Sequence, residues 1–268
     1  MTVSVDLYPS AVDGERRFSG LARLYGQEPA RSIRSSHVAV IGIGGVGSWA
    51  AEALARSGIA ELTLVDMDHV SESNINRQLH ALTDTVGQSK IEAMAKRIGQ
   101  INPACKVHLV DDFVTQDNWP GILGSEVDAV IDACDQVRAK TAIAAWARRN
   151  KKLMISVGAA GGKRAAHLVE IGDLSVCTHD PLLAQLRYRL RKEHGAPKEG
   201  KSIGVSCVYS KEAVRGPDAS CALEGDGTLN CHGYGSMVSV TATFGMCAAG
   251  WIIDKLSSNS VLTQKTAL

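Results

Sequence analysis

Residues 37–48 of the chain read HVAVIGIGGVGS, and this stretch decides the fold. Its first half is a run of β-branched and apolar residues, which predicts a buried strand over His37–Ile43. The glycines that follow predict a tight turn, and VGSWAAEALARS at Val46–Ser57 predicts a helix. A second apolar run at Glu61–Asp66 completes a strand–helix–strand unit.

The same alternation continues along the chain. Further helices are predicted at Lys90–Ile101 and Ala139–Asn150, and further strands at Lys106–Val110, Ala129–Asp132 and Leu153–Val157. Strands that alternate with helices predict an α/β fold with a doubly wound, mostly parallel, Rossmann-like sheet. After Gly158 the pattern changes to glycine turns, a basic helix at Pro181–Glu193 and a Gly/Lys/Pro stretch that looks mobile at Gly195–Gly204. We therefore predict a nucleotide-binding part over residues 1–162 and a C-terminal substrate-binding extension over 163–268.

The composition is that of a globular protein. The 268 residues are 45% hydrophobic and 21% charged, and the net charge of +1 offers no global attraction to nucleic acid. The seven cysteines are odd in number and scattered, which favours a reducing cytoplasm. No CxxC pair occurs, so we expect no structural zinc.

One segment is long enough to be mistaken for a membrane span. Residues 233–253 read GYGSMVSVTATFGMCAAGWII and carry no charge. The segment is rich in Gly, Ser and Thr, which favours a buried helix at the interface of a homodimer. Peripheral membrane association through this segment is the alternative.

The glycine turn predicts a nucleotide site. Gly42, Gly44, Gly45 and Gly47 lie between strand and helix, where backbone N–H groups can approach phosphates at the helix N-terminus. Asp66 ends the next strand, where a carboxylate meets a ribose hydroxyl in dinucleotide-binding proteins. Taken alone, this pattern suggests NAD.

The polar residues after the later strands favour ATP over NAD. They comprise two cations, several carboxylates and two amides: Asp68, Asn74, Arg77, Gln78, Lys90, Asp132 and Asp135. Because the carboxyl ends of parallel strands meet at one edge of the sheet, these side chains should converge. A hydride-transfer site does not need extra cations and carboxylates beside the phosphates, whereas a triphosphate with its magnesium does.

Together these motifs resemble the adenylation domain of the ubiquitin-activating-enzyme-like superfamily. GxGGxGS, DxDxV, NxNRQ, a Lys thirteen residues after the Arg, and DxxD follow in that order between Gly42 and Gly162. The resemblance implies that Gly45 lies against the phosphates and Asp66 binds the ribose. It assigns the triphosphate to Asn74, Arg77 and Lys90, and magnesium to Asp135. The N-terminal segment departs from the RxxRQ element of relatives, so Arg17 or Arg23 would have to supply an arginine to a partner subunit.

Over nearly its full length the chain resembles a narrower family, the bacterial tRNA threonylcarbamoyladenosine dehydratases. The resemblance rests on RFSGLARLYG at residues 17–26, GVSCVYS at Gly204–Ser210, and CHGYG at 231–235 followed by MVSVTATFG. It implies ATP-dependent adenylation of the modified adenosine's carboxylate next to the anticodon, followed by ring closure. A cysteine desulfurase or sulfur acceptor is an implied partner besides tRNA.

Other functions remain compatible with the residues. The first is adenylation of the C-terminus of a ubiquitin-like or sulfur-carrier protein, although relatives of that kind carry a CxxC zinc site. The second is a non-catalytic sulfur-relay or tRNA-docking protein, and an NAD oxidoreductase comes last.

The thiol and basic residues complete the candidate sites. Cys231, beside His232, is the candidate for a reactive thiol, with Cys207 second. His80 and His108 are predicted to be structural and not ligands. A basic segment is predicted to bind tRNA through Arg187, Tyr188, Arg189, Arg191, Lys192, Lys198 and Lys201. Arg148–Lys152 is a second, alternative patch. Gly158–Arg164 resembles a P-loop but lacks its first glycine and final Ser/Thr, so we interpret it as a turn facing the acceptor pocket.

Overall fold

The computed structural model describes residues 3–4, 13–198, 200–216, 218, 220 and 234–265. Its strands are β1 (Val3–Ser4), β2 (His37–Ile41), β3 (Glu61–Val65), β4 (Lys106–Val110), β5 (Ala129–Asp132), β6 (Leu153–Val157), β7 (Val169–Asp173) and β8 (Ser206–Ser210). Its longer helices are α1 (Gly14–Tyr25), α2 (Gln27–Arg34), α3 (Gly47–Arg56), α4 (Lys90–Ile101), α5 (Val137–Asn150), α6 (Pro181–Glu193) and α8 (Val238–Lys265).

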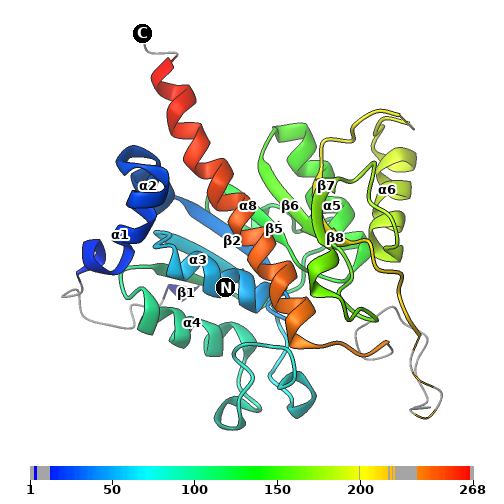
Figure 1. The fold of residues 1–268 in the computed structure, drawn as a ribbon, viewed down its shortest axis with the longest axis horizontal. Coiled ribbons are helices and arrows are strands. Elements are labelled where there is room, and N and C mark those ends of the chain that lie inside the picture. The colour runs from blue at the N-terminus through cyan, green and yellow to red at the C-terminus, as the bar shows by residue number, and fades with distance from the viewer. Residues whose placement is uncertain are drawn as a thin grey trace.

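All eight strands form one sheet in the order β1-β4-β3-β2-β5-β6-β8-β7 (Figure 1). The six inner strands run parallel, and the edge strands β1 and β7 pair antiparallel with β4 and β8. The prediction of a doubly wound, mostly parallel sheet is therefore confirmed. The order reverses direction at β2, where a crevice forms outside the carboxyl ends of the strands.

Helices cover both faces of the sheet. Val38 and Val40 of β2 face α3, α4 and α8, whereas Ala39 and Ile41 face α5 and α6. Because both faces are buried, the inner strands are apolar at nearly every position, which is why they stand out as continuous runs in the sequence.

The part of the chain after residue 162 is built into this same sheet. It contributes β7 and β8 at one edge and α8, which lies along α2 and α3 (Figure 1). Gly245 of α8 approaches α3 so closely that a Cβ there would lie 2.5 Å from the Val46 carbonyl oxygen. The C-terminal helix therefore buttresses the N-terminus of α3, directly behind the glycine turn.

Residues 238–253 of the uncharged segment lie in α8, so the predicted helix is present, while its place at a homodimer interface stays a prediction. Val240, Phe244, Ala248 and Ile252 are buried in the core of the chain itself. Among the described residues, no helix combines the length and the apolar character that crossing a membrane would require.

Candidate active site

A pocket of about 380 Å³ opens at the carboxyl ends of β2 to β6. We call it the strand-end pocket. Its charged and amide residues are Asp66, Asp68, Asn74, Arg77, Gln78, Lys90, Asp112, Asp135 and Gln136. The convergence that the strand pattern predicts is therefore observed for every residue of that set except Asp132, which is buried and does not line the pocket. The size suits a small-molecule ligand.

The glycine turn forms the floor of the strand-end pocket. Gly42 has φ +86°, and a Cβ on it would lie 3.0 Å from the Ala133 backbone. Gly44 and Gly45 line the pocket, whereas Gly47 is buried inside the turn. With backbone N–H groups at the N-terminus of α3 facing the pocket, the turn is suited to bind an anion.

Gly47 and Gly44 give a matched pair of substitutions. In Gly47→Ala, the new Cβ would lie 1.7 Å from the Gly42 carbonyl oxygen, so the turn has to move. We expect Gly47→Ala to destabilise the fold by about 1–3 kcal/mol, as overpacking does. In Gly44→Ala the nearest atom is 3.9 Å away, so its melting temperature should match the parent. Thermal unfolding of both variants measures this, and equal melting temperatures would contradict the close contact at Gly47.

Asp66 connects the glycine turn to the loop after β3. Its carboxylate accepts hydrogen bonds from the Ile43 N–H at 2.6 Å and the Asp68 N–H at 2.9 Å. Burial raises the pKa of Asp66, while Lys90 and the two N–H donors oppose that shift. The side chain thus holds the glycine turn and the loop after β3 together.

The two cations of the strand-end pocket are buried and oriented by neighbouring groups. The Arg77 guanidinium donates to the Ser73 carbonyl at 2.7 Å and to the Asn76 side chain at 3.0 Å. The Lys90 ammonium lies 2.6 Å from the Asp68 carboxylate. Asn74 is buried and accepts from the Ser71 N–H, so part of its amide serves the local turn. Buried cations held in this way are suited to neutralise phosphate charge.

Two polar side chains beside these cations lack partners among the described residues. The Gln78 Oε1 atom and both ring nitrogens of His80 are buried without a hydrogen bond there. Burial and the neighbouring Lys90 lower the pKa of His80 to about 4. His80 is therefore a neutral, buried imidazole, in agreement with a structural role.

His80 should make the protein sensitive to mild acid. Its folded pKa of about 4 lies below the unfolded value of 6.5, so the unfolded state takes up the proton first as pH falls. The contribution is fully present above pH 6.5 and is lost between pH 6.5 and 4, amounting to about 3 kcal/mol. His80→Leu should flatten the fall of unfolding free energy with pH, whereas exposed His167→Leu should leave it unchanged. Urea unfolding at several pH values tests this, and identical profiles for all three proteins would refute it.

Asp135 follows β5 and is exposed in the strand-end pocket. Beneath it lies a fully buried ion pair, in which the Lys140 ammonium is 3.1 Å from the Asp132 carboxylate. Ser156 donates to the same carboxylate at 2.7 Å, and Lys140 also donates to the Asp132 carbonyl. Burial opposes the charge of Lys140, but Asp132 outweighs it and the pKa of Lys140 is raised. This network holds the loop that presents Asp135.

The structure adds pocket residues that the sequence analysis does not identify. Asp112 and Phe113 follow β4, Pro181 begins α6, and Tyr234 and Thr241 come from the C-terminal part. The sequence could have indicated Asp112, because this residue follows a predicted strand whose carboxyl end faces the crevice. Tyr234 and Thr241 lie in the motifs CHGYG and MVSVTATFG, but neither motif assigns them to the pocket, because only the packing of the C-terminal part brings them near.

The P-loop-like segment is a turn beside the strand-end pocket, as interpreted from the sequence. Gly158 to Gly161 line the pocket, but Lys163 is buried and donates to the His179 and Glu212 carbonyls. Burial lowers the pKa of Lys163, and its ammonium serves to tie loops together.

Among the described cysteines, Cys134 lines the strand-end pocket. Burial, followed by Asp132, raises its pKa well above the ordinary value, which disfavours a thiolate. Burial likewise raises the pKa of Cys207, consistent with inert packing. Cys231 lies outside the described residues.

The basic helix α6 is formed as predicted, but its cations differ in availability. Arg187 donates to the Leu174 and Cys177 carbonyls, so its guanidinium serves the fold. Arg191 donates to the Pro197 carbonyl, and Arg189 pairs with Glu193 at 3.2 Å. Tyr188 is exposed, and the Lys192 ammonium lies 5.5 Å from the centre of its ring.

The remaining arginine candidates lie near the N-terminus and at the end of α5. Arg17 donates to the Gln100 and Ile101 carbonyls at the end of α4, so it is engaged within its own chain. Arg23 is exposed and donates only to Ser19 among the described residues. In the second basic patch, Arg148 donates to the Ile203 carbonyl, and Arg149 is exposed.

Comparisons with known proteins place this fold and pocket in a family. The ThiF family model matches residues 18–267. The tRNA threonylcarbamoyladenosine dehydratase of Escherichia coli (strain K12) is 46% identical over 254 residues, which cover 91% of this chain and 95% of that protein. The Haemophilus influenzae protein of the same name is 43% identical and covers 90% of this chain and 94% of its own length.

Solved structures agree with the sequence comparison. The crystal structure of E. coli tRNA N6-threonylcarbamoyladenosine dehydratase, TcdA, in complex with ATP matches with a TM-score of 0.84 at 45% identity. The match covers 92% of this chain and 96% of that one. The complex of the same E. coli protein with AMP matches with a TM-score of 0.84. The chain therefore belongs to the ThiF family, and within it to the tRNA threonylcarbamoyladenosine dehydratases.

Proposed function

We propose that this chain catalyses the ATP-dependent dehydration of threonylcarbamoyladenosine in tRNA, next to the anticodon. The observation that carries the proposal is the strand-end pocket, where the glycine turn, Arg77, Lys90 and Asp135 converge. The E. coli relative, whose structure is known with ATP and with AMP, supports ATP as the substrate and AMP as a product.

Two chemical steps account for the reaction. The substrate carboxylate attacks the α-phosphorus of ATP, and an acyl adenylate and pyrophosphate result. A nitrogen of the same threonylcarbamoyl group then attacks the activated carbonyl carbon, loses its proton and expels AMP as the ring closes. Because nucleophile and electrophile are tethered, effective concentrations on the order of 10⁵ M or more are available and no enzyme nucleophile is required.

The residues of the strand-end pocket divide the work of the first step. Arg77 and Lys90 are assigned to the phosphate charge that grows as pyrophosphate departs. The N–H groups of the glycine turn are assigned to the phosphates, and Asp66 to the ribose. Asn74 and Gln78 complete the contacts. The Gln78 Oε1 atom, which has no partner among the residues that the structure describes, is available to a ligand donor.

The charge of the pocket supports magnesium as the companion of ATP. Among the described residues, its lining holds the cations Arg77 and Lys90 against four carboxylates, Asp66, Asp68, Asp112 and Asp135. A triphosphate alone would meet a net negative wall, so a divalent cation held by Asp135 and phosphate oxygens fits the residues present. When bound, the metal ion neutralises phosphate charge.

One assay tests the proposed function. The protein is incubated with ATP, magnesium and tRNA that bears threonylcarbamoyladenosine, and AMP and the nucleosides are analysed. We expect AMP and a nucleoside lighter by one water, and neither with tRNA that lacks the modification. AMP transfer to a ubiquitin-like C-terminus would favour the runner-up activity, and ATP binding without turnover would favour a docking protein. Tighter binding of NAD than ATP would overturn the site.

The tRNA contact is proposed to lie on α6 and the segment after it. Because Arg187 serves the fold, the test leaves it unchanged and combines Arg189→Glu, Lys192→Glu and Lys198→Glu. We expect weaker tRNA binding. The slope of the logarithm of the binding constant against the logarithm of the salt concentration should fall in magnitude by roughly one for each lost phosphate contact. Fluorescence anisotropy over a salt series measures this. Arg149→Glu, Lys151→Glu and Lys152→Glu together form the control, and a larger effect there would move the contact to that patch.

The remaining assignments concern the assembly and its surroundings. A homodimer is supported by the outward face of α8, where Val238 and Met246 are 43% and 42% exposed at helical spacing. Analytical ultracentrifugation of the full chain tests this. We propose a cytoplasmic location from the scattered, odd-numbered cysteines. A cysteine desulfurase or sulfur acceptor as partner follows from the resemblance, with Cys231 as the thiol candidate.

A further inference from the structure

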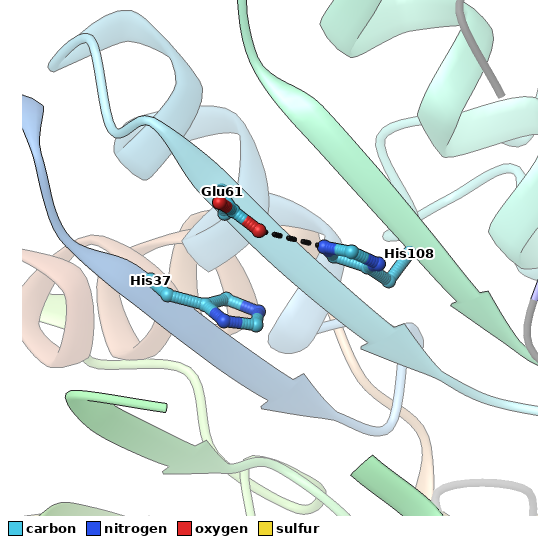
Figure 2. A group of neighbouring side chains, drawn as sticks. All are labelled: His37, Glu61 and His108. Carbon is cyan, nitrogen blue, oxygen red and sulfur yellow. Dashed lines mark hydrogen bonds and ion pairs between the residues drawn. The ribbon is translucent and has the colours of Figure 1, made fainter. Parts of the chain in front are cut away.

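Three metal-binding side chains gather away from the strand-end pocket. His37 begins β2, Glu61 begins β3, and His108 lies in β4 (Figure 2). The register pairs His37 with Glu61, and Thr63 with His108, so the three side chains share one face of the sheet. Their ligand atoms all lie within 4.8 Å of one another. From His37 to the end of β2 is about 13 Å at 3.3 Å per residue, which separates this cluster from the nucleotide turn.

The hydrogen bonds of His37 leave one ring nitrogen suitable for a metal. Its Nδ1 atom lies 2.9 Å from the Glu126 carbonyl oxygen, which can only accept, so Nδ1 carries the proton. The lone pair is therefore on Nε2, which lies 2.8 Å from the Thr63 hydroxyl. An imidazole whose Nδ1–H is bound to a backbone carbonyl is the usual outer arrangement of metal-bound histidines.

The other two groups already face each other. The His108 Nε2 atom lies 2.8 Å from a Glu61 carboxylate oxygen, as the dashed line in Figure 2 shows. Both histidines are buried, with their rings 5.2 Å apart, whereas the Glu61 side chain is 37% exposed. Solvent can therefore reach the cluster beside Glu61.

We propose that His37 Nε2, His108 Nε2 and the Glu61 carboxylate bind a divalent transition-metal ion of the Zn²⁺ class. Two imidazoles and a carboxylate are a frequent donor set for zinc, at about 2.0–2.2 Å from each ligand. Ligand atoms within 4.8 Å of one another reach those distances by small side-chain rotations. A water molecule entering beside Glu61 completes a tetrahedron.

Binding changes the local hydrogen bonds in a defined way. The metal takes the place of the proton between His108 Nε2 and Glu61, and that proton moves to Nδ1 of the same ring, so the imidazole that binds the metal stays neutral. The Thr63 hydroxyl gives up its bond to His37. Lys106, 3.5 Å from Glu61 and half exposed, turns outward. The ion then joins β2, β3 and β4, so its role is structural. The proposal departs from two expectations drawn from the sequence. One is the absence of zinc, which rested on the cysteine pattern alone, and the other is that His108 is structural and not a ligand.

The test uses the full-length protein with Zn²⁺ or Co²⁺ alone as the probe. We expect one ion per chain, a melting temperature that rises with Zn²⁺ concentration, and visible Co²⁺ absorption of a tetrahedral nitrogen–oxygen site. Loss of a group that hydrogen-bonds to a metal ligand typically lowers metal affinity by about 10–100-fold. His37→Gln and His108→Gln remove ligands themselves, so each should lower Zn²⁺ affinity by at least that factor. Because the Glu61 side chain is half exposed, the Glu61→Gln variant should fold. His167→Gln, at an exposed position outside the cluster, is the control.

The outcomes separate the proposal from its alternatives. Weak or absent binding by a folded parent protein overturns it. So does binding that all three ligand variants retain, or Co²⁺ spectra dominated by thiolate bands. ATP-dependent activity is measured separately, because the cluster and the strand-end pocket lie at opposite ends of the strands. Loss or retention of that activity therefore leaves the result for metal binding unaffected.

Discussion

Replacing Asp135 by alanine is expected to lower AMP formation from ATP and modified tRNA by at least about 100-fold, while the protein stays folded. The carboxylate is exposed in the strand-end pocket, so its removal leaves no buried partner unsatisfied. Asp135 is proposed to hold the magnesium ion that neutralises charge developing at the phosphates. Its removal should therefore lower the rate of turnover. Single-turnover measurement of AMP, with circular dichroism as the check on folding, gives the result.

Asp117→Ala is the matched control, because Asp117 is an exposed carboxylate that does not line the strand-end pocket. It should retain parental turnover. The magnesium assignment also predicts that Asp135→Ala shifts the magnesium dependence of ATP binding. A variant that forms AMP at near-parental rate with unchanged magnesium dependence would remove Asp135 from the site.

Lys140→Met is expected to destabilise the fold by about 3–5 kcal/mol, the usual cost of removing one partner of a buried ion pair. Both Lys140 and Asp132 are completely buried, and the methionine would leave the Asp132 carboxylate with only the Ser156 hydroxyl and the Cys134 thiol as side-chain donors. Because this carboxylate begins the loop that carries Asp135, ATP affinity should fall as well. Urea unfolding and calorimetry with ATP measure the two effects.

The double variant Lys140→Met with Asp132→Asn separates the two contributions. If the loss arises from the unpaired charge, removing that charge should recover a large part of the stability. Lys96→Met, on the exposed side of α4, should change stability by no more than about 0.5 kcal/mol. A Lys140→Met protein as stable as Lys96→Met would show that the buried pair contributes little.

Much of the fold is predictable because the inner strands are buried on both faces. The predicted limits of α4, β4, β5, β6 and α6 agree with the structure, since continuous apolar runs and helical periodicity mark them. The edge strand β7 lacks this signal, because its residues are mostly exposed or half-exposed, and a pattern search alone does not identify it.

The candidate site likewise contains residues that the sequence predicts and residues whose role depends on the tertiary structure. Arg77, Lys90, Asp66 and Asp135 follow strands that belong to one parallel sheet, so the topology itself brings them to one edge. Arg187 shows the limit of composition as a guide. A basic helix predicts phosphate contacts, but the fold places two carbonyls within reach of this guanidinium, and they bind it.

The sequence by itself determined the strand–helix alternation, the glycine turn and the set of polar residues at the strand ends, because each of these depends on neighbours along the chain. Only the tertiary structure decided which distant segments meet. The approach of α8 at Gly245 brings Thr241 to the strand-end pocket, and the register of three strands brings His37, Glu61 and His108 together. Register and helix packing depend on contacts between residues far apart in the chain, and no local pattern specifies them.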